Sequence, residues 1–285
     1  MVDLSDLNKL PQITRKTVEE TRAKEPKRIC FSVYETGEPK RSKNPSFVGT
    51  FNVPFGEGFS RLFPWTLFPN KHDKFHKESV WLSISDEQEF LKIEAWVKSQ
   101  GPRVFLRDCL STSVALSHNF CNTTDGKRTD IGQLEFLAKN QHDADATRTL
   151  SKYSLDAIRE LEHYRTTNFI AAVPPRPSKE YDLPSEIVKQ ISNDCSNMSD
   201  ITGYFHFGND KHSLKSVSLD GKWDSWEEAD LSIDCDLTGK DVILLDDKYQ
   251  SGCTIQFVAM KLQEAGARQI FGLSLVKTMR DTDNQ

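Results

Sequence analysis

The chain has 285 residues, of which 28% are charged and 37% are hydrophobic, and its formal net charge at pH 7 is −5. A chain of this length can bury a large core and is compatible with one large domain or two smaller ones. No segment approaches the roughly 18–20 consecutive apolar residues that a membrane-spanning helix needs, so we expect no membrane partner. The acidic balance also argues against a protein that binds nucleic acid mainly through its phosphates.

The six cysteines are scattered along the chain and include no C-x-x-C pair. The N-terminal residues are acidic and lack the apolar segment of a signal peptide, so the sequence predicts reduced thiols and a cytoplasmic location. Cys109, His118 and Cys121 are ligand types that zinc prefers, but a zinc site normally has four ligands and no fourth one fits this spacing. We therefore expect no zinc site there.

The N-terminal part predicts a short series of mixed elements. The first thirty residues indicate a polar helix that ends at Pro26, a strand follows over 29–35, and 40–46 is a basic loop. The segment 47–70 is rich in Phe, Pro and Gly, a composition typical of irregular structure packed on aromatic rings.

A strand over 79–85, a helix over 86–101 and a strand over 103–108 come next. The helix has Asp86 at its start and Gly101 at its end, which are typical residues for these positions. We expect the three elements to form a short βαβ-like unit.

Turn-forming residues fill 121–132 and mark the best domain boundary. We therefore predict an N-terminal α+β region over 1–128 and a second domain over 129–285. After the boundary the pattern predicts helices over 132–143 and 150–164 and then alternates strands with helices. This alternation indicates an α/β fold with a mainly parallel sheet flanked by helices.

The segment 240–278 contains the pattern that carries chemistry. Four apolar residues over 242–245 predict a strand buried on both faces, and Asp246 and Asp247 stand at its carboxyl end. Ligands of such sheets bind at the carboxyl ends of the strands. A turn leads from there into a helix and consists of Gln250, Ser251, Gly252, Cys253 and Thr254.

A turn of this composition suits a phosphate monoester. The backbone N–H groups at the start of a helix point towards the ligand, and the helix dipole adds positive charge. Ser251 and Thr254 can donate hydroxyl hydrogen bonds, and Gly252 allows the backbone to approach the ligand closely. Asp246 and Asp247 repel a phosphate and are better placed to accept hydrogen bonds from vicinal sugar hydroxyls or to hold a hydrated Mg²⁺.

This strand, acid pair and Ser-Gly-x-Thr turn resemble the phosphoribosyl pyrophosphate (PRPP) motif of type I phosphoribosyltransferases. The resemblance implies that Asp246 and Asp247 hold the ribose hydroxyls, with Mg²⁺ beside them, and that the turn 250–254 cradles the 5′-phosphate. Two residues depart from the family pattern: Lys248 replaces an aliphatic residue, and Gln250 stands where Thr is frequent. We keep Lys248 among the predicted catalytic residues because a lysine favours a neighbouring phosphate or diphosphate.

A second match lies upstream in 168–192, where a strand, a Pro-rich basic loop and a helix follow one another. In type I phosphoribosyltransferases the loop after this strand binds pyrophosphate, and its placing resembles the ComF-like branch of the family. The resemblance implies that Arg176 and Lys179 are the cations for the diphosphate leaving group. A plain surface loop with solvated charges is the alternative.

Residues 203–234 correspond to a mobile flap that closes over the reacting centre in this family. Closure would exclude water from a ribosyl cation, and a purely structural hairpin is equally compatible with the sequence. The basic residues of this segment that we consider are Lys211, Lys215 and Lys222, with His206 and His212 as weaker choices.

The residues leave two functions open. The first is an enzyme of nucleotide metabolism, a glycosyltransferase that binds PRPP with Mg²⁺, releases pyrophosphate and joins ribose 5-phosphate to a nitrogenous acceptor. The second is a PRPP- or nucleotide-binding effector of a ComF-like or bacterial defence system that acts through a protein or nucleic-acid partner, with 40-KRSK-43 as a basic contact.

Oligomeric state and acceptor follow only from the resemblance. Type I enzymes are more often dimers than not, which implies a homodimer. Base recognition in this family comes from a variable hood, so Phe63, Trp65 or Phe68 could stack on a base if the N-terminal part folds over the site.

Overall fold

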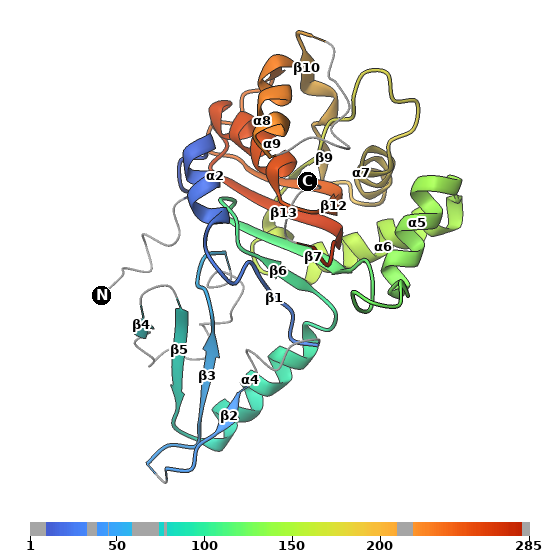
Figure 1. Ribbon diagram of the computed structural model, residues 1–285. Helices are drawn as coiled ribbons and strands as arrows, with labels where there is room; N and C mark the ends of the chain where they lie inside the picture. Colours follow the sequence, from blue (N-terminus) through green and yellow to red (C-terminus); the bar gives the residue numbers. More distant parts are fainter. Residues whose placement is uncertain are drawn as a thin grey trace.

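The computed structural model describes residues 10–32, 39–44, 46–58, 74–76, 79–209 and 219–280. Its centre is a seven-stranded sheet in which β7, β13, β12, β8 and β9 run parallel (Figure 1). At one edge β6 pairs antiparallel with β7, and β1 pairs antiparallel with β6. In spatial order the strands are β1 (Arg28–Ile29), β6 (Val104–Leu106), β7 (Thr112–His118), β13 (Gln269–Lys277), β12 (Asp241–Tyr249), β8 (Phe169–Ala172) and β9 (Ser199–Asp200).

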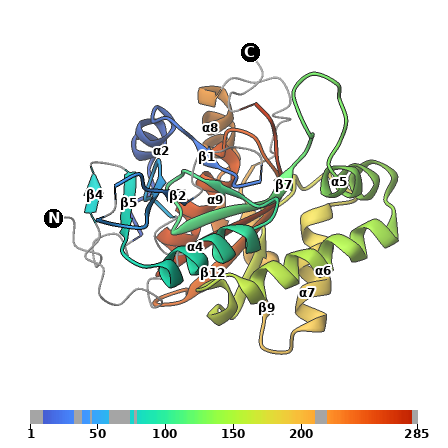
Figure 2. The same ribbon diagram turned by 90° about the horizontal axis from the view of Figure 1, so that it is seen from below.

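Helices cover both faces of this sheet. One group consists of α5 (Asp130–Gln141), α6 (Ala144–Glu160) and α7 (Leu183–Asp194), and the other of α2 (Arg15–Arg22), α8 (Leu219–Glu228) and α9 (Cys253–Glu264). Figure 2 shows α5, α6 and α7 together on the side of the molecule away from α2. The predicted α/β fold with a mostly parallel sheet flanked by helices is confirmed.

Strand β12 is buried on both faces because its alternate side chains enter two separate cores. Ile243 and Leu245 pack with the group of helices that contains α5, α6 and α7. Val242 and Leu244 pack with α2, α8 and α9. A strand in this position has no polar face, which explains the continuous apolar run in its sequence.

A small antiparallel sheet and one helix form the α+β part of the N-terminal region, at the bottom of Figure 1. Its strands, in spatial order, are β2 (Lys40–Arg41), β3 (Gly49–Val53), β5 (Ser79–Ile84) and β4 (Lys74–His76). Side chains of β3 and β5 share a core with α4 (Glu87–Ser99). The predicted βαβ-like unit over 79–108 is wrong, because β5 belongs to this small sheet and β6 belongs to the central one.

Strand β7 joins the N-terminal region to the central sheet. It pairs antiparallel with β6 and parallel with β13, and all seven of its residues are buried. We predicted no strand here, because Thr112, Ser113, Ser117 and His118 interrupt the apolar pattern of the segment. The boundary between residues 128 and 129 stays a prediction, and the central sheet takes strands from both sides of it.

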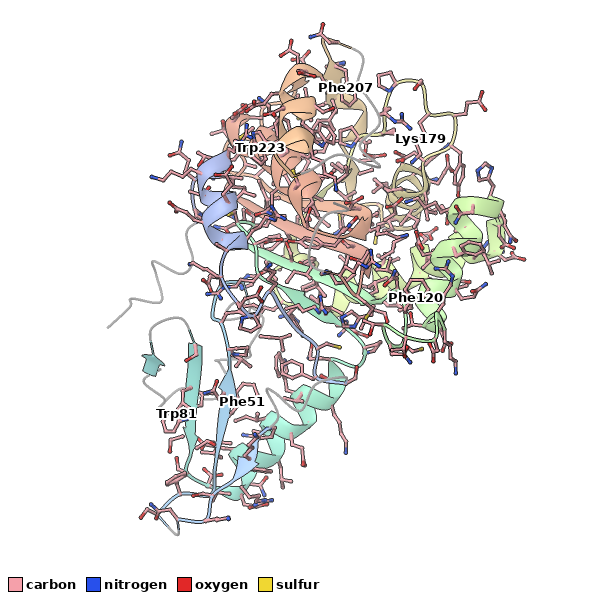
Figure 3. All side chains as sticks on the ribbon, in the orientation of Figure 1. Phe51, Trp81, Phe120, Lys179, Phe207 and Trp223 are labelled. Atoms are coloured by element: carbon pink, nitrogen blue, oxygen red, sulfur yellow. The ribbon has the colours of Figure 1, made fainter. Side chains whose placement is uncertain are left out.

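Between β9 and β12 the chain forms a short antiparallel pair, β10 (Phe205–Phe207) and β11 (Leu231–Ile233), with α8 between them in the sequence. Trp223, labelled in Figure 3, lies on α8. It packs edge-on against Phe257 of α9, with ring centroids 5.0 Å apart. Within the described ranges, no helix has both the length and the apolar character needed to cross a membrane.

Helix α5 begins so close to the end of β7 that only glycine fits at position 132. A Cβ atom there would lie 2.1 Å from the carbonyl oxygen of Asn119 and 2.8 Å from its carbonyl carbon. Both are backbone atoms, so no side-chain rotation relieves the clash. Gly132 therefore sets the distance between α5 and the sheet.

We expect Gly132→Ala to lower the free energy of unfolding by about 1–3 kcal/mol, because the overpacking cost outweighs the gain in helix propensity. Gly203→Ala is the matched control, since a Cβ atom at Gly203 meets nothing within 4 Å. Its stability should stay within about 0.5 kcal/mol of wild type. Urea denaturation followed by circular dichroism measures both, and equal stabilities of the two variants would contradict the close approach.

Candidate functional site

The carboxyl ends of β8 and β12 border a cavity of about 560 Å³. Side chains from the β8–α7 loop, the end of β12, α5, α8 and α9 line it. Five of the residues predicted from the sequence lie among them: Arg176, Lys179, Asp246, Asp247 and Thr254. The fold thus brings together the two segments that carry the separate sequence matches.

The parallel pairing of β8 with β12 explains this meeting. Ala172 lies opposite Leu245, and the N–H of Val173 donates a 2.8 Å hydrogen bond to the carbonyl oxygen of Leu245. The loop after β8 therefore leaves the sheet beside the two acids that end β12. Lys179 lies in this loop, which leads to α7 (Figure 3).

Asp246 and Asp247 are neighbours in sequence but differ in their surroundings. The side chain of Asp246 is half-buried, and Asp247 is buried. Burial, followed by the charge of Asp247, raises the pKa of Asp246 to about 7, while the charge of Lys139 acts in the opposite direction. The Asp246 carboxyl therefore holds a proton more readily than an ordinary aspartate does.

Four charged side chains of alternating sign form a network between the end of β12 and α5. Asp247 Oδ2 lies 2.5 Å from Lys139 Nζ, which lies 4.0 Å from Glu135 Oε1. The same Glu135 oxygen lies 3.2 Å from Lys248 Nζ. Burial is the largest influence on the pKa of Lys139 and lowers it, but the charge and hydrogen bond of Asp247 together with the charges of Glu135 and Asp246 raise the pKa overall. Lys139 therefore stays an ammonium.

Lys248 is directed to this network, and it is not among the described residues that line the cavity. Sequence reasoning missed Glu135 and Lys139, although both belong to a helix that it predicted. Their i,i+4 spacing was the available signal, but such pairs are common on solvent-exposed helices.

The turn before α9 packs against a tyrosine ring. Gly252 has a left-handed backbone with φ +77° and precedes the first residue of α9 without a side-chain cap. A Cβ atom at Gly252 would lie 2.2 Å from the hydroxyl oxygen of Tyr249. Glycine is therefore needed here for the chain's own packing, in addition to the close approach of a ligand that we expect from the sequence.

Hydrogen bonds with residues of the N-terminal region support this turn. The side-chain amide of Gln256 donates to the carbonyl oxygen of Gly252 at 3.1 Å, and its oxygen accepts from the N–H of Cys109 at 3.0 Å. The hydroxyl of Tyr249 donates to Asp108 Oδ2 at 3.2 Å. The partners Cys109 and Asp108 were not predicted, because these contacts join residues 147 and 141 positions apart in the chain. Ser251 and Cys253 are buried in the same place, and only Thr254 of the turn lines the cavity.

The loop cations differ in their partners. Lys179 Nζ lies 2.7 Å from Asp182, the residue that caps the start of α7. Arg176 is half-buried, and within the described part of the chain its guanidinium has no ion-pair or hydrogen-bond partner. A half-buried guanidinium that lines a cavity without a partner is suited to an anionic ligand.

Of the basic residues in the expected flap, Lys222 of α8 lines the cavity. His206 is exposed on β10 and does not belong to the lining. Lys211, His212 and Lys215 lie outside the described residues, as do Phe63, Trp65 and Phe68.

The residues present do not fit a Mg²⁺ ion held directly by Asp247. In the part of the chain that the structure describes, no three His, Cys, Asp or Glu side chains are grouped so that they could hold a metal ion. Asp247 is already in contact with the Lys139 ammonium at 2.5 Å. A dication bound to the same carboxylate would lie beside that ammonium and be repelled by it.

Comparisons with known proteins add little. No protein-family profile and no curated protein matches the chain. A phosphoribosylpyrophosphate synthetase from Mycobacterium smegmatis resembles part of the structure, with 16% identity, coverage of 46% of this chain and 33% of that one, and a TM-score of 0.26. The chain thus covers a third of that enzyme, and the likeness is too slight to assign a function.

Asp108 gives a pH-dependent prediction. Its burial raises its pKa to about 6, although hydrogen bonds from the backbone N–H of Leu110 and from the hydroxyl of Tyr249 oppose the shift. The folded protein then keeps this proton up to about pH 6, whereas the unfolded chain loses it near pH 4. The stability that Asp108 contributes is therefore fully present below pH 4 and is lost as the pH rises through 6.

We expect the stability difference between Asp108→Asn and wild type to change in favour of the variant between pH 4 and pH 7. The change should reach up to about 3 kcal/mol, because Asn has no proton to lose. Urea denaturation at several pH values measures it. A difference that does not vary with pH would contradict the raised pKa.

Proposed function

We propose that the protein is a cytoplasmic phosphoribosyltransferase that binds PRPP and transfers its ribose 5-phosphate with release of pyrophosphate. The observation that carries this proposal is the shared cavity. Its lining includes Asp246 and Asp247 from the end of β12 and Thr254 from α9, together with Arg176 and Lys179 from the loop after β8. Carboxylates for hydroxyl groups and cations for phosphates are the two kinds of contact that PRPP requires.

The 5′-phosphate belongs at the start of α9 in this proposal. No side chain caps this helix, so its first N–H groups can donate to phosphate oxygens, and the helix dipole favours a negative charge there. Thr254 adds a hydroxyl from the side of the cavity. The other residues of the turn, 250–253, do not line the cavity, so Thr254 is the turn side chain that contacts the phosphate in this proposal.

The ribose and the diphosphate occupy the remaining parts of the cavity. Asp246 and Asp247 accept hydrogen bonds from the vicinal hydroxyls and orient the sugar. Arg176 and Lys179 bind the diphosphate and stabilise the negative charge that grows on it as the bond to the ribose carbon breaks. A nitrogenous acceptor then attacks that carbon from the open side. We assign no step to Mg²⁺ at Asp247, and Mg²⁺ would enter bound to the diphosphate.

The alternative, a PRPP-binding effector, is an outcome of the same experiment. Within the basic run that could contact a nucleic acid, Arg41 is engaged by Glu87, with its guanidinium nitrogen 2.5 Å from a carboxylate oxygen. The same guanidinium lies over the ring of Phe90. Arg41 therefore serves the small sheet and α4, which leaves Lys40 and Lys43 for a partner.

Binding of two different ligands tests the two halves of the site separately. Calorimetry with ribose 5-phosphate tests the turn and the acid pair, and PRPP adds the diphosphate. We expect Arg176→Gln to weaken PRPP binding by about 10–100-fold, the effect of losing hydrogen bonds between charged groups, and to leave ribose 5-phosphate binding within about twofold. Arg148→Gln, an exposed change on α6, is the matched control and should leave both ligands unaffected.

We expect weaker binding of both ribose 5-phosphate and PRPP in the variants Asp246→Asn and Asp247→Asn, because each variant loses a carboxylate acceptor for the sugar hydroxyls. Unchanged binding of ribose 5-phosphate to the Asn variants would contradict the proposed site. Release of pyrophosphate from PRPP in the presence of a panel of bases identifies the acceptor. Tight PRPP binding without release for any base supports the effector instead.

A further inference from the structure

Lys139 is held at the acid pair by contacts on both sides. Its ammonium lies between Asp247, 2.5 Å away, and Glu135, 4.0 Å away. The Glu135 side chain is 1% exposed and belongs to the same helix, so packing holds its carboxylate in place. The ammonium therefore lies between two carboxylates, in direct contact with the one that lines the cavity.

The negative charge of Glu135 is balanced by a second lysine, Lys248. Glu135 lies 3.2 Å from Lys248, so the four side chains Asp247, Lys139, Glu135 and Lys248 have a net charge of zero. Loss of Lys139 would leave two buried carboxylates with one lysine, a strongly unfavourable arrangement. This balance differs from that of a metal site, whose carboxylates keep their negative charge until the metal binds.

We propose that Lys139 is a built-in counter-ion of the acid pair, whose ammonium takes the place of a divalent cation at Asp247, so that ribose 5-phosphate binds without metal. This inference rests on the proposed function and specifies how its ribose site works. Lys139 also lines the cavity. It reduces the repulsion between the carboxylates and the ligand's phosphate while Asp247 keeps an oxygen for a hydroxyl group.

The first test uses Mn²⁺ alone, followed by electron paramagnetic resonance. Wild type should bind no Mn²⁺ at Asp247 below roughly 1 mM, whereas Lys139→Met should gain a site that is lost again in the double variant Lys139→Met, Asp247→Asn. Tight Mn²⁺ binding by wild type that disappears in Asp247→Asn overturns the proposal. That comparison does not require Lys139→Met to fold.

The second test measures ribose 5-phosphate binding by calorimetry in EDTA and in Mg²⁺. Wild type and Lys139→Arg should bind equally within about twofold in both buffers. Lys139→Met should bind about tenfold more weakly in EDTA and recover in Mg²⁺. Lys152→Met, which removes an exposed i,i+4 partner of Asp156 on α6, is the matched control and should behave like wild type.

The outcomes separate the two proposals. A wild type that binds ribose 5-phosphate only in Mg²⁺ overturns the role of Lys139 and supports the proposed function. A wild type that binds it in neither buffer overturns the proposed function, and the Mn²⁺ measurement then decides by itself whether Lys139 occupies a cation position.

Discussion

The parallel pairing of β12 with β8 and β13 is the constraint on which the rest of the molecule depends. Its register places Leu245 opposite Ala172, so the acid pair and the loop with Arg176 leave the sheet at the same edge. The register is secured because alternate residues of β12 belong to different cores. A shift by one residue would exchange the contents of both cores, and the resulting misfit keeps the site in place.

Elements with a local pattern were predictable, and pairings between distant segments were not. The apolar run of β12 and the amphipathic patterns of α4 and α6 identify these elements from sequence alone. Strand β7 was missed because its burial comes from β6, β13 and the helices rather than from an apolar sequence. The assignment of β5 and β6 to one unit failed because a periodic pattern does not say which sheet a strand joins.

The site residues also divide into those that a local sequence pattern predicts and those that only distant contacts bring together. Asp246, Asp247, Thr254, Arg176 and Lys179 could be placed in one cavity because each belongs to a recognisable strand–turn–helix segment. The groups that control their charge and support could not be found in this way. Lys139 becomes a partner of Asp247 only through the packing of α5 on the sheet, and Asp108 reaches Tyr249 across 141 residues.

Strand β13 fills the space between β12 and β7, and this has a consequence for synthesis on the ribosome. Ser111, just before β7, bonds to Ile270 in β13 across 159 residues. While β7 can pair at once with the adjacent β6, its other edge must wait for the C-terminal strand, roughly 8–30 s at ~5–20 residues per second. An open strand edge invites pairing with other chains. A nascent chain that stalls before β13 would present the edges of both β7 and β12, so the synthesis of β13 decides whether the preceding chain aggregates or closes.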